Sequence, residues 1–279
     1  MHNAARVGIL TVLAMLAFAG NSLLCRAALR DTAIDAASFT SIRLVSGALV
    51  LAVIVLARGS RPWAAGNWRA AAMLFAYAAL FSFAYRQLTA ATGALLLFGA
   101  VQMTMLGYAL ASGERLRGLQ WLGLLVALAG LIGLLLPGLA APPLASALFM
   151  LGAGVAWGVY SLLGRGGGDP TGGTAGNFLR AVPFTAALSL AMATQATFDT
   201  TGVLYAVASG AITSGLGYAL WYAALPAFKA ASAATIQLSV PAIAALGGVL
   251  LLAEPLSSRL LIASVAILGG IALVIWRRR

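Results

Sequence analysis

Long apolar runs separated by short polar segments are the main pattern along the chain. Each run is about 20 residues long, the length at which a helix spans a bilayer. The runs are continuous and do not alternate apolar with polar positions, which favours helices over the strands of a membrane β-barrel. The pattern predicts ten spans, at 7–27, 36–57, 69–88, 90–111, 118–136, 144–164, 178–196, 202–224, 229–252 and 259–276.

Two stretches of the chain are similar to one another. Residues 89–136 align with residues 229–276 at a constant offset of 140, with ten of 48 positions identical, and the Glu-x-Leu that begins at Glu114 recurs at Glu254. Because each half holds five spans, an odd number, the second copy enters the membrane in the opposite orientation. The predicted fold is an all-α polytopic membrane protein built from two inverted five-helix repeats, at 1–138 and 139–279.

Composition agrees with this class and narrows the chemistry. Hydrophobic residues make up 62% and charged residues 8%, whereas soluble domains carry about 25% charged residues. The net charge of +11 is attributed to Lys and Arg in the loops, which set the orientation of the chain in the membrane. We therefore expect no nucleic-acid partner. The sequence has one cysteine, Cys25, and one histidine, His2, so neither a disulfide nor a Cys/His zinc site is available within the chain. We expect no metal and no cofactor.

The distribution of Lys and Arg predicts the orientation. With the N terminus inside, eleven lie in cytoplasmic segments and four in the outer loops, at Arg26, Arg30, Arg86 and Arg259. Both termini are therefore expected in the cytoplasm. Glu114 then faces the inside and Glu254 the outside, and we expect both to act in gating. The linker at 165–177 has six glycines and is expected to be mobile.

The ionisable residues do not form a catalytic set. All six acids lie in loops or at span ends, so no buried carboxylate pair is expected for acid/base work, and we expect no enzymatic activity. Arg43 and Arg180 are the ionisable residues inside spans. Each can extend to a membrane interface or contact a substrate carboxylate, and the sequence leaves both interpretations open.

Polar and aromatic residues within the spans are the candidate site. An amide in hydrocarbon is costly unless it faces protein or water, so a bond between helices and the lining of a cavity both remain open for such residues. Small residues at Gly210-x-x-x-Ser214 allow close helix packing. The predicted substrate-binding residues are Phe18, Asn21, Tyr77, Phe81, Phe98, Gln102, Trp157, Tyr160, Tyr218, Trp221, Gln237 and Pro241.

The chain resembles the drug/metabolite transporter superfamily, EamA type, in four features. These are the repeated Glu-x-Leu, the glycine-containing span that follows each copy of it, the arrangement of five plus five spans, and the segment Ala230-Ala-Ser-Ala-Ala234. Within it, the chain is most similar to the bacterial aromatic amino-acid exporters. The resemblance implies a basket of spans 1, 3, 4, 6, 8 and 9 around a central cavity in the bacterial inner membrane. The small four-span exporters of that superfamily use a glutamate in their first helix, where this chain has Asn21.

Several functions remain in competition. The first is a secondary transporter that exports amino acids, aromatic or neutral, or similar small metabolites by alternating access without proton coupling. Its partners are a small-molecule substrate and the lipid bilayer, and the oligomeric state is left open, a monomer included. Other transport substrates are nucleobases, sugar phosphates or drugs. A membrane-embedded enzyme, a lipid-handling protein or a scaffold without a solute are alternatives of other classes.

Overall fold

The computed structural model describes residues 2–113, 115–116, 118–138, 141–164, 168–228, 233 and 236–276, with the side chains of 2–4 and 276 left out. All regular structure in this part of the chain is helical. Its elements are α1 (His2–Asp31), α2 (Ala36–Ala57), α3 (Trp68–Tyr85), α4 (Ala90–Ala111), α5 (Gly118–Leu135), α6 (Leu144–Leu163), α7 (Pro170–Ala191), η1 (Ala193–Gln195), α8 (Thr200–Ala208), η2 (Ser209–Leu216), α9 (Gly217–Ala224), η3 (Leu225–Ala227), α11 (Ser239–Leu252) and α12 (Ser258–Trp276).

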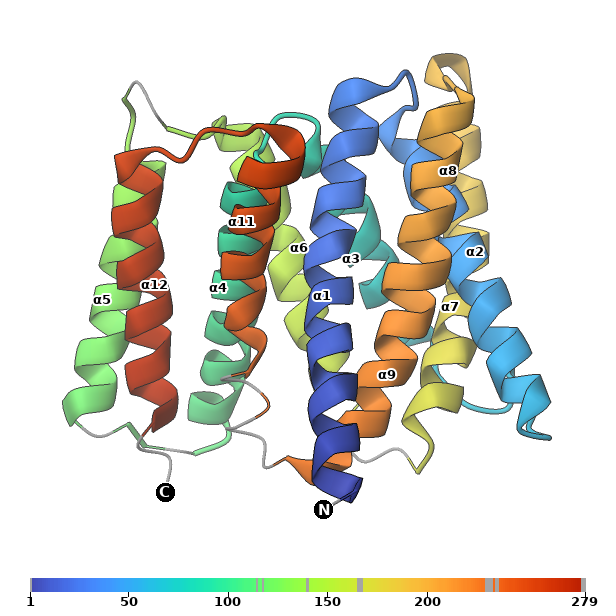
Figure 1. Ribbon diagram of the computed structural model, residues 1–279, viewed down its shortest axis with the longest axis horizontal. Coiled ribbons are helices and arrows are strands. Elements are labelled where there is room, and N and C mark those ends of the chain that lie inside the picture. The colour runs from blue at the N-terminus through green and yellow to red at the C-terminus, as the bar shows by residue number, and fades with distance from the viewer. Residues whose placement is uncertain are drawn as a thin grey trace.

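The helices stand side by side and run up and down between two faces (Figure 1). Both termini lie at the same face, called here the termini face, and the face at the other end of the helices is called the opposite face. Within the described residues, eight helices are long and apolar enough to cross a membrane, the stretch from α8 to η3 counting as one. The chain is therefore a polytopic membrane protein.

Short polar side chains fix where the helices begin. Asn67 caps α3, Thr89 caps α4 and Asp199 caps α8, each accepting a hydrogen bond from a backbone N–H of the first turn. Asp35 caps α2 through Ala37 and Ser38. Burial raises the pKa of the Asp35 carboxyl, but hydrogen bonds with neighbouring groups outweigh it and hold the pKa below its ordinary value. These caps satisfy N–H groups that a helix start leaves without partners.

The segment 165–177 differs from the expected mobile linker. Residues 165–167 lie outside the described part, but α7 already begins at Pro170, capped by Asp169, eight residues before the predicted span. Proline at a helix start loses no hydrogen bond. A side chain at Gly176 would overlap the backbone of Ala65. Gly176 thus allows close packing of α7 against the loop at 64–67.

The helices α5 and α12 form a pair beside the remaining helices (Figure 1). Their contact depends on glycine, because a Cβ at Gly123 would come within 2.6 Å of the Gly270 carbonyl oxygen and one at Gly130 within 2.7 Å of the Ala266 side chain. Backbones approach this closely in membranes where small residues line the contact. The outer side of α5 exposes large apolar side chains, as expected for a surface in lipid. They include Leu119, Trp121, Leu122, Leu125, Leu128 and Ile132.

Candidate functional site

A small cavity lies at mid-length of the helices. Its walls come from six places in the chain: α1, α3, α4, α6, the η2–α9 segment and the residues just before α11. The free volume is about 20 Å³, on the order of what one water molecule requires. The cavity is therefore nearly closed in this structure. Its lining residues are Phe18, Asn21, Ser22, Tyr77, Phe81, Leu97, Phe98, Trp157, Thr213, Tyr218 and Gln237.

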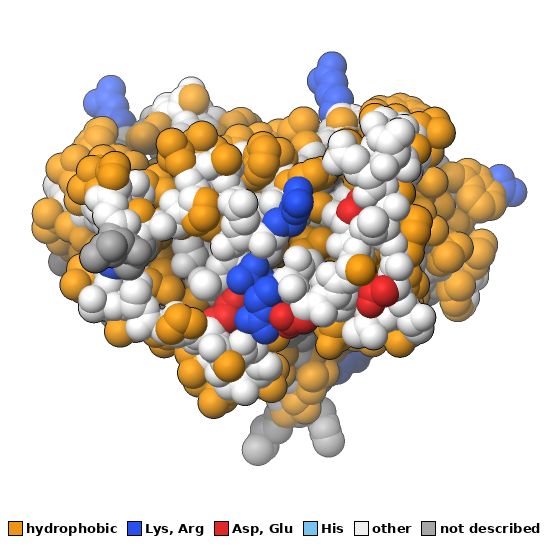
Figure 2. Space-filling model, turned by 90° about the horizontal axis from the view of Figure 1, so that it is seen from above, with side chains coloured by type: hydrophobic (Ala, Val, Ile, Leu, Met, Phe, Trp, Pro, Cys, Tyr) orange, Lys and Arg blue, Asp and Glu red, His pale blue; other side chains and the backbone are white. Residues whose placement is uncertain are grey.

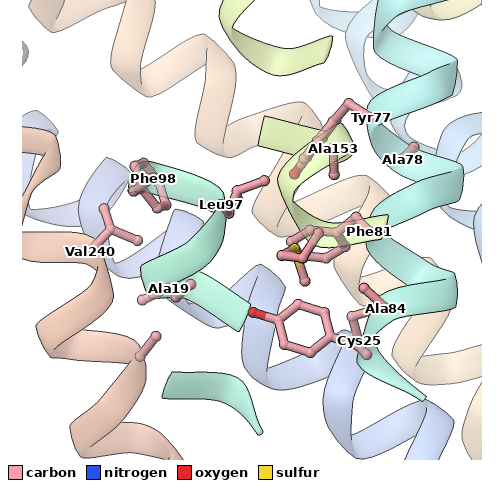
Figure 3. Packing of buried hydrophobic residues seen from close by; sticks show 14 of the residues in the cluster. Ala19, Cys25, Tyr77, Ala78, Phe81, Ala84, Leu97, Phe98, Ala153 and Val240 are labelled. Carbon is pink, nitrogen blue, oxygen red and sulfur yellow. The ribbon is translucent and has the colours of Figure 1, made fainter. Parts of the chain in front are cut away.

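Aromatic rings form most of the wall, with Trp157 at their centre. The Trp157 ring lies 4.9 Å from the Tyr77 ring and 5.1 Å from the Tyr218 ring, centroid to centroid, and stacks on Tyr160 at 5.3 Å. Such spacings are those of favourable ring pairs. Figure 3 shows Tyr77 and Phe81 projecting from α3 and Phe98 on the neighbouring α4. This aromatic part of the wall suits a ring or another apolar group.

The polar part of the wall centres on Asn21. Its side-chain nitrogen donates to the Tyr77 hydroxyl at 3.2 Å, and its oxygen accepts from Ser209 at 2.7 Å and from Thr213 at 3.4 Å. Asn21 therefore makes bonds between helices and also lines the cavity. The sequence left open a bond between helices and the lining of a cavity, and Asn21 does both.

The segment η2 is a π-helix of eight residues between α8 and α9. Backbone hydrogen bonds in a π-helix reach one residue further than in an α-helix, and such segments are frequent at functional sites. Here η2 carries Ser209, Thr213 and Ser214, all buried. Two of these hydroxyls reach Asn21 and the third reaches Arg43. The π-helix thus supplies hydroxyls to both polar centres of the site.

Arg43 is buried, with 1% of its surface exposed, so it does not extend to a membrane interface. Its Nη2 donates to the Tyr77 hydroxyl at 2.9 Å and its Nε to Ser214 at 3.2 Å. The guanidinium carbon lies 5.1 Å from the centre of the Tyr77 ring and 5.0 Å from that of the Phe81 ring. Arg43 therefore stands directly behind two residues of the cavity wall.

Arg180 occupies a different environment. Its Nη1 donates to the carbonyls of Ala65 at 2.7 Å and Gly176 at 3.0 Å, and its Nη2 to that of Trp63 at 3.1 Å. It fastens the loop between α2 and α3 to α7, at the termini face, away from the cavity. Of the two arginines within spans, only Arg43 is next to the candidate site.

The structure brings eight of the twelve predicted residues into the cavity lining, namely Phe18, Asn21, Tyr77, Phe81, Phe98, Trp157, Tyr218 and Gln237. The other four, Gln102, Tyr160, Trp221 and Pro241, are buried but do not line it. Tyr160 stacks behind Trp157, and Trp221 packs against Phe18 at 6.2 Å. Pro241 lies in the first turn of α11, which begins at Ser239, ten residues after the start of the predicted span 229–252.

Sequence reasoning missed Ser22, Leu97 and Thr213 as lining residues. Leu97 and Ser22 have no distinguishing sequence signal, because leucine and serine are ordinary span residues. Thr213 lies in Gly210-Ala-Ile-Thr-Ser-Gly215, where two hydroxyl residues between glycines depart from the surrounding apolar run. That departure was a usable signal.

An ion pair closes the opposite face above the cavity. Glu254 is 6% exposed and accepts from Arg26 Nε at 2.8 Å through one oxygen. Its second oxygen accepts from the Ala90 backbone N–H, at the start of α4, at 2.8 Å. Buried pairs of this kind hold when further hydrogen bonds satisfy the remaining atoms. Glu254 thus joins α1 and α4 to the end of α11.

The backbone aims Glu254 at this position. Ala253 ends α11 in the left-handed conformation, with φ of 51°, and the Glu254 N–H bonds back to the Gly248 carbonyl at 3.0 Å. Viewed from above, arginine and acidic side chains gather in the middle of this face (Figure 2). The group comprises Arg26, Arg30, Asp31 and Glu254. Glu114, the other predicted gating residue, lies outside the described residues.

The cavity is lined by aromatic, aliphatic, amide and hydroxyl side chains. The described lining residues include no charged side chain and no histidine. Among the residues that the structure describes, no group of three or more His, Cys, Asp or Glu is placed to hold a metal ion. A helical membrane protein with a nearly closed aromatic and amide-lined cavity at mid-depth has the architecture of a membrane transporter.

Comparison with known proteins gives the family. The EamA-like transporter family matches residues 144–276. An uncharacterized protein of Pseudomonas aeruginosa is 63% identical over 271 residues, which cover 97% of this chain and 94% of that protein. The chain belongs to the EamA-like transporter family, and its membership makes it a membrane transporter of small molecules.

A solved structure shares the fold. It is described only as "Crystal structure of protein", and it matches with a TM-score of 0.67 at 21% sequence identity, covering 98% of this chain and 99% of that chain. At this identity the similarity concerns the fold alone.

Proposed function

We propose that the chain is a secondary transporter that exports amino acids, aromatic or neutral, or similar small metabolites across the bacterial inner membrane. The observation that carries this proposal is the cavity itself, an uncharged aromatic wall with amide and hydroxyl groups beneath a buried ion pair. The apolar wall matches a hydrophobic side chain, and the polar groups around Asn21 match a backbone-like headgroup. In this proposal the chain has no enzymatic activity.

Two inverted halves, at 1–138 and 139–279, would form ten spans. Helix contacts support this pairing. The contact of α2 with α7 joins the second spans of the two halves, that of α4 with α11 joins the fourth, and that of α5 with α12 joins the fifth. The contact of α1 with α11 has its counterpart in that of α6 with α4. Such reciprocal contacts are expected for a pseudo-two-fold axis in the membrane plane.

Alternating access would open the cavity to one face at a time. A free volume of about 20 Å³ is too small for an amino acid, so the helices must separate for the substrate to enter. The Arg26–Glu254 pair is proposed as the outer gate, with Glu114 as its counterpart at the inner face. Both termini would be cytoplasmic, which places Glu254 outside.

Transport is proposed to proceed without proton coupling. A coupled proton needs a group that changes charge within the membrane, and the described part of the chain places no Asp, Glu or His in the cavity lining. An accumulated metabolite would leave the cell along its own concentration gradient. A monomer in the lipid bilayer would be sufficient for this transport.

The test is counterflow in proteoliposomes across a panel of amino acids, nucleobases, sugar phosphates and cationic drugs. Exchange of labelled phenylalanine that is competed by aromatic and neutral amino acids is the expected result. Exchange confined to nucleobases, sugar phosphates or drugs would replace the substrate, and the absence of exchange for every member would favour an enzyme, a lipid-handling protein or a scaffold. An imposed pH gradient should leave the exchange of phenylalanine unchanged.

A further inference from the structure

Arg43 is a buried cation without a carboxylate partner. The ion pairs among the described residues join Arg26 and Arg30 to Glu254 and Asp31, and none includes Arg43. With 1% of its surface exposed, the guanidinium charge is shielded from solvation by bulk water. A charge buried without a partner is unfavourable in a membrane protein and marks a functional position.

The groups around Arg43 stabilise its charge only in part. Tyr77 and Ser214 each accept one hydrogen bond from Arg43, and two ring faces lie about 5 Å from the guanidinium carbon. The third nitrogen, Nη1, is buried and has no hydrogen-bond partner within the described structure. An unsatisfied buried donor on a charged group is costly, and an anion that enters the site would supply what it lacks.

The Tyr77 hydroxyl connects this charge to the cavity. Its oxygen accepts from Arg43 Nη2 at 2.9 Å and from Asn21 Nδ2 at 3.2 Å, so both acceptor positions of the oxygen are used. The hydroxyl proton is left to donate, and Tyr77 lines the cavity. A phenol that accepts from a guanidinium is polarised and donates more strongly. The wall therefore presents a hydrogen-bond donor backed by a positive charge.

We propose that the site recognises the carboxylate of its substrate through Tyr77 and Arg43, and that the substrate needs no ammonium group. The inference rests on the proposed transport function and names its substrate class: a carboxylate with a ring-sized apolar body. The body would lie against Trp157 and Tyr218, and the carboxylate would accept from the Tyr77 O–H and from Arg43 Nη1. Among the lining residues that the structure describes, no side chain is acidic and able to pair with an ammonium.

Charge movement follows from this assignment. A carboxylate without an ammonium group carries one negative charge, and a membrane potential that is negative inside drives anions outward. Export of such a substrate would therefore be powered by the potential, without a proton. A zwitterion such as phenylalanine carries no net charge and would be indifferent to it.

The experiment uses three probes that share a phenyl ring and differ in the headgroup: 3-phenylpropionate, phenylalanine and phenethylamine. Binding to the purified full chain in detergent is measured by calorimetry. We expect both carboxylates to bind, and phenethylamine to bind at least about tenfold more weakly, the loss that one charged hydrogen bond represents. Phenethylamine binding as tightly as 3-phenylpropionate, or a failure of both carboxylates to bind, overturns the proposal.

Variants locate the effect. Arg43→Gln and Tyr77→Phe should each weaken carboxylate binding by about tenfold or more, and Arg43→Lys by less. Tyr77→Phe keeps the ring and tests the site even where Arg43→Gln does not fold. Arg180→Gln removes a cation that contacts only loop and helix carbonyls and should bind as the unaltered protein does. Carboxylate affinity unaffected by Tyr77→Phe overturns the assignment.

Transport separates this inference from the proposed function. Export of 3-phenylpropionate from proteoliposomes should rise with an inside-negative potential, while that of phenylalanine should not. Transport of phenethylamine in preference to both carboxylates would leave a transporter standing and overturn the carboxylate site. Binding of the carboxylates without transport of any solute would support the site and contradict the transporter.

Discussion

At the residue scale, Trp157 is the side chain on which the cavity wall depends. It contacts the rings of three tyrosines, Tyr77, Tyr160 and Tyr218. It is only partly buried, and it lines the cavity. If Trp157 serves binding more than packing, its substitution should lower transport much more than it lowers stability.

Trp157→Ala should lower transport by at least about tenfold, since the aromatic contact with the substrate is lost. The melting temperature in detergent should change little, because the ring fills a site and not a sealed core. Trp68→Ala is the control, as Trp68 is 57% exposed at a helix end. A loss of about 3–5 kcal/mol of stability, typical of aromatic core truncations, would show that Trp157 is packing.

Glu254 is the residue that ties three helix ends together, and the native thiol can report on it. Cys25 is fully buried next to Arg26 and is the single cysteine of the chain. Glu254→Gln weakens the pair with Arg26, so the opposite face, which is outside in the proposed orientation, should open more often. Labelling of Cys25 by a membrane-impermeant maleimide from outside should then become faster.

Asp31→Asn is the matched control for this gate, because Asp31 is exposed and pairs with Arg30. It should leave the labelling rate of Cys25 unchanged. Equal rates in Glu254→Gln and the unaltered protein would mean that the ion pair does not limit outer access.

At the element scale, the π-helix η2 depends on glycine. A Cβ at Gly210 would overlap the Ser46 hydroxyl and the Arg43 carbonyl oxygen of α2, so η2 can approach α2 only without a side chain there. This close contact also brings Ser214 within reach of Arg43. The packing of one glycine therefore sets the geometry of the polar site.

Gly210→Ala should destabilise the protein by about 1–3 kcal/mol, the range for overpacked contacts, and should reduce transport further than the stability loss explains. Gly107→Ala is the control, since nothing lies within 4 Å of a Cβ at that position on α4. Thermal unfolding and transport of both variants in the same detergent and lipid give the comparison. Full activity in Gly210→Ala would contradict a role for η2 in shaping the site.

At the scale of the whole molecule, the order of helices fixes which loops share a face. Ser60, in the loop after α2, and Gln195, in the loop after α7, are both exposed. These loops lie at the two ends of the helices, because α2 and α7 end at opposite faces (Figure 1). The proposed orientation places Ser60 inside and Gln195 outside.

In a Cys25→Ala background, a cysteine at Gln195 should react with an impermeant maleimide on intact cells, and one at Ser60 only after the membrane is opened. The reverse pattern would invert the proposed topology. Labelling of both from outside would contradict the crossing of the membrane by the intervening helices.

Periodicity and residue type indicated much of the site. An amide within an apolar span must face protein or water, and a deep indole N–H needs a hydrogen-bond partner. These two constraints predicted Asn21 and Gln237, and Trp157, from the sequence. The ends of α2 and α4 were also predicted at Ala36–Ala57 and Ala90–Ala111. The polar residues Asp35 and Thr89 cap those helices, and capping is local chemistry that a sequence displays.

The sequence by itself determined that the chain is helical, lies in a membrane and carries its polar groups at chosen depths, because these properties follow from local hydrophobicity and residue type. Only the tertiary structure decided which polar groups meet. The early start of α7, the π-helix at Ser209–Leu216 and the position of Arg43 behind Tyr77 depend on contacts between helices far apart in the chain. No single span encodes those contacts, since the same arginine would reach an interface if its neighbours did not enclose it.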